Sequence, residues 1–161
     1  MGTEYELVNK LTNKKYTIST AESCTGGLLS GAIVGVDGAS EVFGCGFVTY
    51  SEKAKEQLVQ VKHDTLIRCG AVSAETAGEM AVGCERTAKS DMGLSTTGIA
   101  GPGGGTAETP VGLVYIGCSL HNIVKTRRFF FQGDRNEVRS QAVEAALKLA
   151  LECLEEEVTA R

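Results

Sequence analysis

The sequence predicts an α/β fold, specifically a three-layer α/β/α sandwich around a mixed β-sheet. Short β-branched segments alternate with segments of helical periodicity along most of the chain, as in parallel strands joined by helical connections. Near the C-terminus two strand-like segments instead follow one another directly, which predicts an antiparallel hairpin in the same sheet. The chain has 161 residues and shows neither a linker nor an internal repeat, so we expect one domain over residues 1–161.

The elements of the first half are predicted from apolar spacing, β-branched runs and capping residues. Tyr5, Val8 and Leu11 recur at helical spacing and predict an N-terminal amphipathic helix. Glycines within the second expected strand indicate a bulge or close packing there. In order, we expect a helix over residues 4–13, a strand over 16–20, a helix over 27–34, a strand over 43–50 and a helix that begins with Ser51 as its N-cap and ends at about residue 59.

The second half is expected to hold two further helices, the hairpin and a C-terminal helix. Polar residues that precede helical patterns predict N-caps at Asp64, Ser73 and Asp134. His121 and Asn122 are expected in the hairpin turn. In order, we expect a short helix at residue 64, a helix over 74–88, a strand over 92–97, a loop over 98–105, strands over 111–119 and 124–131, and a helix from 135 to about 155.

Composition and charge exclude several classes of function. The net charge is -4, which disfavours a broad nucleic-acid-binding face. The longest apolar stretch, around residues 111–118, is far shorter than the ~20 residues of a membrane span, and the N-terminus does not resemble a secretory signal. Six cysteines are spread along the chain without a CxxC pair, so we expect free, buried thiols. We therefore expect a cytoplasmic protein that binds neither nucleic acid nor membrane.

Missing motifs narrow the chemistry further. The chain has no Gly-Lys dipeptide, which excludes a P-loop with its lysine, and it has no HExxH or CxxC motif. His63 and His121 lie in polar surroundings without a cysteine or acidic cluster at ligand spacing, so we expect neither a metal site nor a cofactor. Both histidines fit plain surface positions, which weakens a Ser-His-Asp scheme. If a serine is the nucleophile, lysine is the best available base.

The most reactive segment is the turn AESCTGG at residues 21–27, between the first strand and the following helix. It combines hydroxyls, a thiol and a carboxylate with two glycines that allow a ligand to approach closely. At such a junction Ser23 is placed to act as a nucleophile, with backbone N–H groups available to an oxyanion. In the alternative interpretation, Ser23 or Thr25 is only the N-cap of the helix. Cys24 is a rival nucleophile in the same turn.

A second junction between a strand and a helix, YSEKAK at residues 50–55, supplies candidate bases. In the simplest interpretation, Lys53 and Lys55 are solvated side chains in the first turn of the helix. In the alternative, the helix dipole and burial lower the pKa of a lysine from ~10.4 towards neutrality, as a general base requires. Only substantial burial or a second cation produces such a shift.

Two further segments fit the binding of an anionic ligand. Arg135 lies in the capping segment of the last helix, where its charge opposes the helix dipole. It forms either a local ion pair with Asp134 or Glu137, or a site for an external anion together with free N–H groups. The Gly-rich loop over residues 98–105 is suited to wrap a planar or phosphorylated ligand with backbone donors, although many such loops are only turns.

Five motifs occur in an order that resembles the nicotinamide-nucleotide amidase family, which is also the C-terminal domain of CinA-type competence/damage-inducible proteins. The motifs are TAESCTGG at 20–27, GFVTYS at 46–51, GAVS at 70–73, GIAGP at 98–102 and GDR at 133–135. The resemblance covers nearly the whole chain. The sequence is therefore identified as a member of this family, with one CinA C-terminal-like amidohydrolase domain.

The resemblance implies a serine amidohydrolase that converts nicotinamide mononucleotide into nicotinate mononucleotide and ammonia. The family's serine and lysine dyad falls on Ser23 and Lys55, with Tyr50 and Arg135 as supporting groups. The small nucleotide substrate is then expected to be bound by Thr25, Gly26, Gly27, Gly98, Gly101, Gly103 and Arg135.

Two alternatives and two further expectations accompany this interpretation. In the first alternative, the chain is a catalytically silent nucleotide-binding or interaction domain. In the second, it is a hydrolase whose nucleophile is Cys24. Larger CinA-type proteins carry an additional N-terminal domain that resembles molybdopterin-binding folds, and we expect no activity of that domain here. Three consecutive aromatic residues on a strand, Phe129, Phe130 and Phe131, place at least one ring on each face. Covering both faces needs either helices or a partner, and we expect a homo-oligomer, specifically a dimer.

Overall fold

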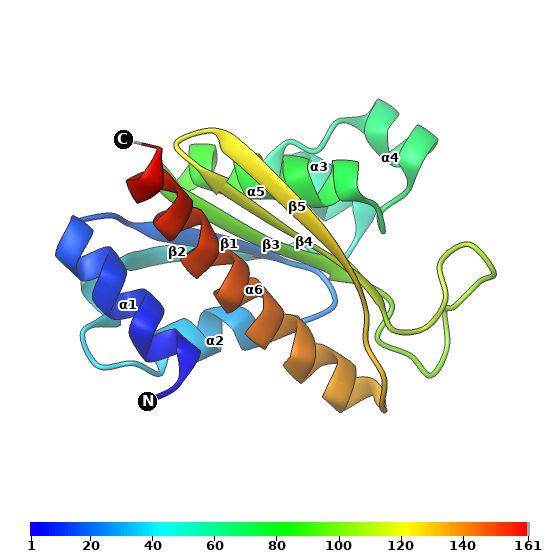
Figure 1. The fold of residues 1–161 in the computed structure, drawn as a ribbon. Helices are drawn as coiled ribbons and strands as arrows, with labels where there is room; N and C mark the ends of the chain where they lie inside the picture. The colour runs from blue at the N-terminus through cyan, green and yellow to red at the C-terminus, as the bar shows by residue number, and fades with distance from the viewer. Residues whose placement is uncertain (161) are drawn as a thin grey trace.

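The computed structural model describes residues 1–160 and contains a mixed five-stranded sheet between two layers of helices (Figure 1). The strand order is β2-β1-β3-β4-β5. The central strand β1 is parallel to β2 and β3, whereas β4 is antiparallel to β3 and β5. The strands are β1 (Ile18–Glu22), β2 (Phe43–Val48), β3 (Met92–Gly98), β4 (Leu113–Leu120) and β5 (Ile123–Phe130). The predicted fold class, an α/β/α sandwich with a mixed sheet, is confirmed.

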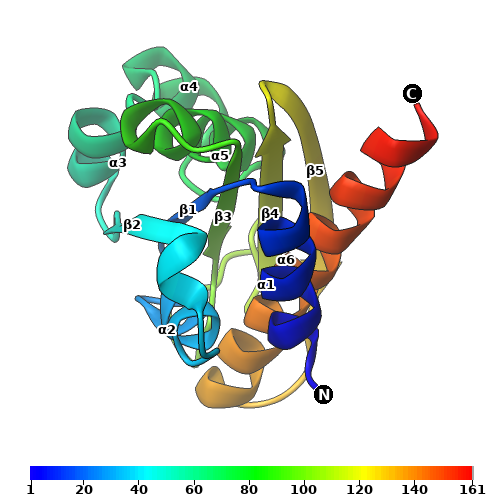
Figure 2. The ribbon, with the colours of Figure 1, turned by 90° about the vertical axis from the view of Figure 1, so that its left-hand side faces the viewer.

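Helices cover both faces of this sheet (Figure 2). The helices are α1 (Thr3–Lys14), α2 (Leu28–Val34), α3 (Glu52–Val59), α4 (His63–Cys69), α5 (Ala74–Ala88) and α6 (Arg135–Thr159), with a short 3-10 helix at Ala39–Glu41. The larger core packs α1, α2 and α6 against one face of the sheet, and a smaller core packs α3, α4 and α5 against the other. Every residue of β1 is buried because this central strand lies between the two layers of helices.

The first strand is displaced from its predicted position by two residues. β1 begins at Ile18 and ends at Glu22, rather than spanning residues 16–20. Pairing decides the boundary, because Ile18 is the first residue in register with both neighbouring strands and Glu22 is the last. The shift matters for function, since it places Ser23 immediately after the strand.

Three of the four predicted helix caps are confirmed, and one is wrong. Oγ of Ser51 accepts from Ala54 N at 3.0 Å. Oγ of Ser73 accepts from Thr76 N at 3.1 Å, and Oδ1 of Asp134 accepts from Glu137 N at 2.9 Å. Asp64 instead lies inside the first turn of α4, which begins at His63. A carboxylate is favourable anywhere in a first helical turn, so the sequence does not distinguish the two positions.

The glycines of β2 and the hairpin turn behave as the sequence predicted. The β1–β2 register shifts between Ile18 and Ser19, as in a bulge. A Cβ atom at Gly46 would lie 2.6 Å from Oγ1 of Thr20, so this glycine also allows close packing. His121 and Asn122 form the turn between β4 and β5 with φ values of 50° and 65°, as in the tight turns that favour hairpins.

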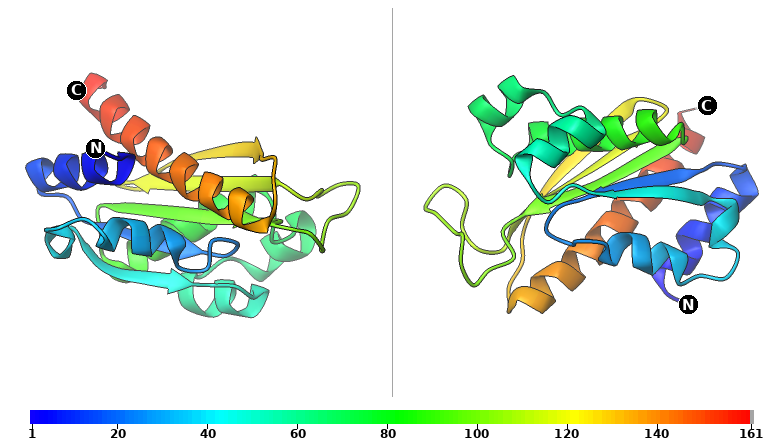
Figure 3. Two further views of the ribbon diagram at one scale, coloured as in Figure 1. Left: turned by 90° about the horizontal axis from the view of Figure 1, so that it is seen from below. Right: turned by 180° about the vertical axis from the view of Figure 1, so that it is seen from behind.

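Two further features concern the chain as a whole. The segment between β3 and β4 carries no helix or strand and extends beyond the sheet, which is visible from behind in Figure 3. Within residues 1–160, no helix combines the length and apolar character required to cross a membrane.

Candidate active site

The topology brings the predicted site segments to one end of the sheet, where the parallel strands have their carboxyl ends. Because β4 is antiparallel to both of its neighbours, the strands β1, β2, β3 and β5 all run in the same direction. The carboxyl ends of such strands are the usual place for ligands in α/β sheets. A cavity of about 220 Å³ lies at this carboxyl end of the sheet. Its lining includes Ser23, Cys24, Tyr50, Lys55, Gly98 and Arg135.

Ser23 and Lys55 contact each other in this cavity. Nζ of Lys55 lies 3.0 Å from Oγ of Ser23 and donates to the carbonyl oxygen of Thr49 at 2.7 Å. The residue is only 1% exposed although it lies on a surface helix. Burial lowers the pKa of Lys55 from its ordinary value of 10.5 to about 8, while Cys24 and Glu52 act in the opposite direction. Lys53 remains exposed, so the structure selects Lys55 from the two candidate lysines.

The helix after Ser23 is capped by neither Ser23 nor Thr25. The N-cap position of α2 is Gly27, and the fully buried carboxylate of Glu22 binds the free N–H groups there. Its two oxygens accept from Gly27 N, Leu29 N and Ser30 N, and from the hydroxyls of Thr25 and Ser30, at distances of 2.6 to 3.2 Å. The first turn of α2 is therefore occupied by an internal anion, a role for Glu22 that sequence reasoning missed.

The predicted substrate-binding residues of this turn lie outside the cavity lining. The hydroxyl of Thr25 contacts Glu22 and, at 2.7 Å, Thr96. Gly26 N donates to Ser23 O at 3.1 Å, and Gly26 and Gly27 have φ values of 55° and 108° that favour glycine. Among the described residues, the backbone N–H groups of Cys24 and Thr25 have no acceptor. Of these two residues Cys24 lines the cavity, whereas Thr25 is fully buried outside the lining.

Cys24 lies beside Ser23 but in a different electrostatic situation. Its thiol is buried, and burial raises its pKa from 9.0 to about 11. A thiol is a good nucleophile only as the thiolate, so the protonated Cys24 is a poorer candidate than Ser23. All six cysteines are free, as predicted, although Cys45 is exposed and Cys69 is half-buried rather than buried.

Arg135 joins the Gly-rich loop to Tyr50 at the mouth of the cavity. Its Nη1 donates to the carbonyl oxygen of Gly101 at 2.8 Å, and its Nη2 donates to the hydroxyl of Tyr50 at 3.3 Å. Within residues 1–160, its guanidinium forms no ion pair with Asp134, Glu137 or any other carboxylate. The predicted local ion pair is therefore absent from this part of the chain, and the charge of Arg135 faces the cavity without a counter-ion.

The Gly-rich loop contributes unevenly to the site. Gly98 lines the cavity, and Gly101 contributes the carbonyl group that Arg135 binds. Gly103 is exposed and lies outside the lining. The structure thus brings the beginning of this loop to the cavity, but not Gly103.

Arg139, one turn after Arg135 on α6, was not singled out from the sequence. Its Nε and Nη2 donate to the carbonyl oxygens of Cys24 and Thr25, each at 3.0 Å. The only available signal was its spacing of four residues from Arg135, which places both arginines on one face of a helix.

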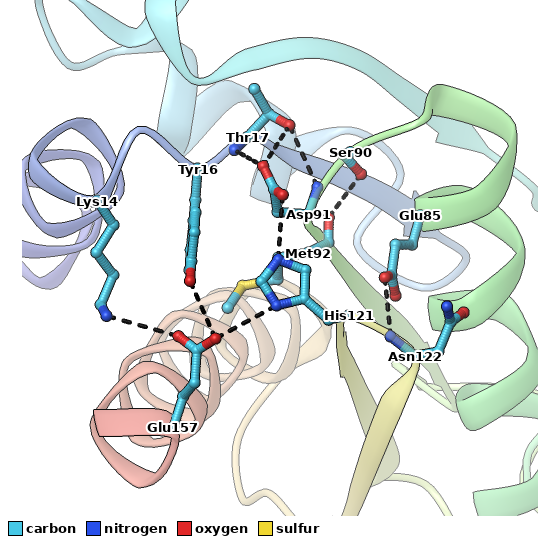
Figure 4. A network of polar contacts seen from close by, with 10 residues as sticks. All are labelled: Lys14, Tyr16, Thr17, Glu85, Ser90, Asp91, Met92, His121, Asn122 and Glu157. Carbon is cyan, nitrogen blue, oxygen red and sulfur yellow. Dashed lines mark hydrogen bonds and ion pairs between the residues drawn. The ribbon is translucent and has the colours of Figure 1, made fainter. Parts of the chain in front are cut away.

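Neither histidine is part of the cavity. His121 lies between Asp91 and Glu157, with the ring of Tyr16 beside it (Figure 4). Asp91 precedes β3 and His121 follows the antiparallel β4, so this network lies at the end of the sheet opposite to Ser23. His63 contacts Glu56 on the surface. Within residues 1–160, no group of three or more His, Cys, Asp or Glu side chains is placed to hold a metal ion.

Known proteins match both the sequence and the structure. The model of the CinA C-terminal domain family matches residues 2–154. A protein of Clostridium acetobutylicum, provisionally named competence-damage inducible protein, is 56% identical over 137 residues, which cover 85% of this chain and 33% of the relative. A protein of Caldanaerobacter subterraneus with the same name is 50% identical over 151 residues, which cover 93% of this chain and 37% of the relative. The chain thus spans about a third of the length of these relatives.

Solved structures agree with this result. A CinA superfamily protein from Klebsiella pneumoniae superimposes with a TM-score of 0.92 at 33% identity, over 96% of each chain. The competence/damage inducible protein CihA from Agrobacterium tumefaciens gives a TM-score of 0.90 at 40% identity, over 96% of this chain and 97% of that chain. The site described above is therefore carried by a chain that belongs to the CinA C-terminal domain family.

Proposed function

We propose that the protein is a nicotinamide-nucleotide amidase that hydrolyses the carboxamide of nicotinamide mononucleotide. The main support is the contact between Ser23 and Lys55, in which a buried lysine with a pKa of about 8 lies 3.0 Å from a serine hydroxyl. A lysine of lowered pKa is a competent general base near neutral pH. The family relationship gives further support, because Ser23 lies within one of the motifs that carry the resemblance and the dyad that the resemblance implies falls on Ser23 and Lys55.

In this proposal, neutral Lys55 accepts the proton of Ser23 as Oγ attacks the carboxamide carbon. The N–H group of Cys24, which lines the cavity and has no backbone acceptor among residues 1–160, stabilises the oxyanion. The C–N bond then breaks, and Lys55 returns the proton to the departing ammonia. Lys55 next activates a water molecule that cleaves the acyl-enzyme, giving nicotinate mononucleotide and free Ser23.

The nucleotide part of the substrate is assigned to the mouth of the cavity. Arg135 has no counter-ion among the described residues and lies where the cavity opens, so it is suited to bind the phosphate group. Tyr50 is 62% exposed and offers its ring to the pyridine or ribose. Gly98 also lines the cavity, and Gly101 holds Arg135 through its carbonyl oxygen.

The activity is tested by incubating the purified protein with nicotinamide mononucleotide and measuring ammonia and nicotinate mononucleotide. The Ser23→Ala variant is the matched control. Turnover by the wild type that is lost in this variant supports the proposal. Binding of the nucleotide without turnover would instead favour the catalytically silent binding domain.

We further propose that the protein acts in the cytoplasm as a homo-oligomer. Free thiols at all six cysteines fit a reducing compartment. Phe129 and Phe131 stack with ring centroids 5.1 Å apart and pack against the core, whereas Phe130 is 53% exposed. Phe130 is therefore the candidate contact, and sedimentation of the wild type and of Phe130→Glu tests it. A wild type that sediments as a monomer refutes oligomerisation.

A further inference from the structure

Arg139 of helix α6 binds the turn at residues 21–27, which we call the nucleophile turn because it carries Ser23. The guanidinium donates from Nε to the carbonyl oxygen of Cys24 and from Nη2 to that of Thr25, both at 3.0 Å. These residues are more than a hundred positions apart in the sequence. Two consecutive carbonyl groups are thus bound by one rigid, planar donor.

The surroundings of Arg139 match this role. Its side chain is half-buried, and within residues 1–160 it forms no ion pair with a carboxylate. A Cβ atom at Gly26 would lie 3.4 Å from Nη2 of Arg139, and Gly26 has a φ of 55°. The guanidinium therefore lies in ordinary contact range of this position, and it is the φ of Gly26 that favours glycine there.

The contact determines the direction of two peptide groups. In a trans peptide, the C=O of one residue and the N–H of the next point in opposite directions. Because Arg139 binds the carbonyl groups of Cys24 and Thr25, the N–H groups of Thr25 and Gly26 point away from it. Gly26 N donates to Ser23 O at 3.1 Å, whereas Thr25 N has no acceptor in the described chain.

We propose that Arg139 is a positioning residue for the amidase reaction, which anchors the turn after Ser23 and so holds the Ser23 hydroxyl and the adjacent Cys24 N–H in place for attack and for binding the oxyanion. This inference rests on the proposed function. Arg139 lies outside the cavity lining, and its guanidinium is engaged by the turn. In this proposal Arg139 acts on the reaction through the turn that it binds and makes no contact with the nucleotide.

The Arg139→Gln variant tests the proposal by separating kcat from substrate binding. Losing one oxyanion donor costs about 10²- to 10³-fold in kcat. A donor that is only misoriented is expected to cost about 10- to 100-fold. The dissociation constant for nicotinamide mononucleotide, measured in a Ser23→Ala background, should stay within about twofold. Arg139→Lys, which keeps the charge but not the fork, should recover part of kcat.

Arg127→Gln is the matched control, because Arg127 on β5 forms an ion pair with Glu152 on α6 and lies outside the cavity lining. It should lose some stability without losing kcat. Full kcat in Arg139→Gln overturns the proposal. So does a loss in Arg139→Gln that appears only as weaker nucleotide binding, since that result assigns the residue to the substrate.

A readout without catalysis keeps this proposal separate from the proposed function. In folded Arg139→Gln, the amides of residues 23–29 should exchange hydrogen about tenfold faster than in the wild type, because the turn is released from α6. Unchanged exchange refutes the positioning role. If the wild type shows no amidase activity, the proposed function fails, and hydrogen exchange still decides whether Arg139 holds the turn.

Discussion

Nζ of Lys55 lies 3.0 Å from Oγ of Ser23, although 32 residues separate them in the sequence. The parallel arrangement of β1 and β2 causes this contact, because each residue follows the carboxyl end of its strand. Burial then holds the pKa of Lys55 near 8. Two residues from separate strand-to-helix junctions thereby meet as a hydroxyl beside a buried amine, the pair that the proposed mechanism requires.

Ser23 rather than Cys24 is expected to be the nucleophile. Ser23→Ala should lower kcat at least about 10³-fold, because the attacking oxygen is removed. Cys24→Ala should change kcat less than about tenfold, since the buried thiol is protonated at neutral pH. Ammonia release measures both variants. Full activity of Ser23→Ala together with an inactive Cys24→Ala would reverse the assignment.

The activity should depend on pH through Lys55. Only its neutral form accepts a proton, so kcat/KM should rise about tenfold per pH unit below about 8 and level off above it. The charge of Glu52 raises the pKa of Lys55, so Glu52→Gln should move this rise to lower pH. A profile that is flat between pH 6 and pH 9 would exclude Lys55 as the base.

Protein stability should respond to the same group. The folded state has a pKa of about 8 for Lys55 and the unfolded chain about 10.5, so the unfolded state binds more protons between these values. The free energy of unfolding of the wild type should therefore rise relative to Lys55→Met, by up to about 1.4 kcal/mol per pH unit, from about pH 8 to pH 10. Denaturant unfolding across this range measures the difference. Parallel curves for the two proteins would contradict the shifted pKa.

Arg135 should contribute mainly to the binding of the phosphate group. Arg135→Gln removes charged hydrogen bonds worth about 1.5–3 kcal/mol, so the KM for nicotinamide mononucleotide should rise about 10- to 100-fold. The corresponding nucleoside, which lacks the phosphate, should be hydrolysed equally well by the wild type and by Arg135→Gln. Equal losses for both substrates would place Arg135 elsewhere in the reaction.

Glu22 should be a major determinant of stability. Glu22→Gln replaces a buried acceptor of five hydrogen bonds by a group that also carries donors. We expect a loss of about 2–4 kcal/mol in the free energy of unfolding. The exposed Glu108 offers a control, because Glu108→Gln should change stability by less than about 0.5 kcal/mol. Comparable unfolding midpoints for the two variants would show that the Glu22 network is not stabilising.

The local sequence was sufficient to predict most elements and three helix caps. Hydrophobic periodicity and capping residues act over a few positions, so Ser51, Ser73 and Asp134 were recognisable from their neighbours alone. The strand boundary at Ile18 was not, since it depends on pairing with β2 and β3. The fold class followed from the order of the elements.

The sequence by itself also singled out Ser23, the two lysines Lys53 and Lys55, and Arg135, with open alternatives for each, while Tyr50 entered through the family resemblance. Only the tertiary structure decided between them. It buried Lys55 while leaving Lys53 in solvent, left Arg135 without the local ion pair within residues 1–160, and gave the cap of α2 to Glu22. The contacts of Arg139 with the nucleophile turn were also settled at this level. The reason is physical: a pKa or a hydrogen bond depends on burial and on partners distant in the sequence, which local patterns do not encode.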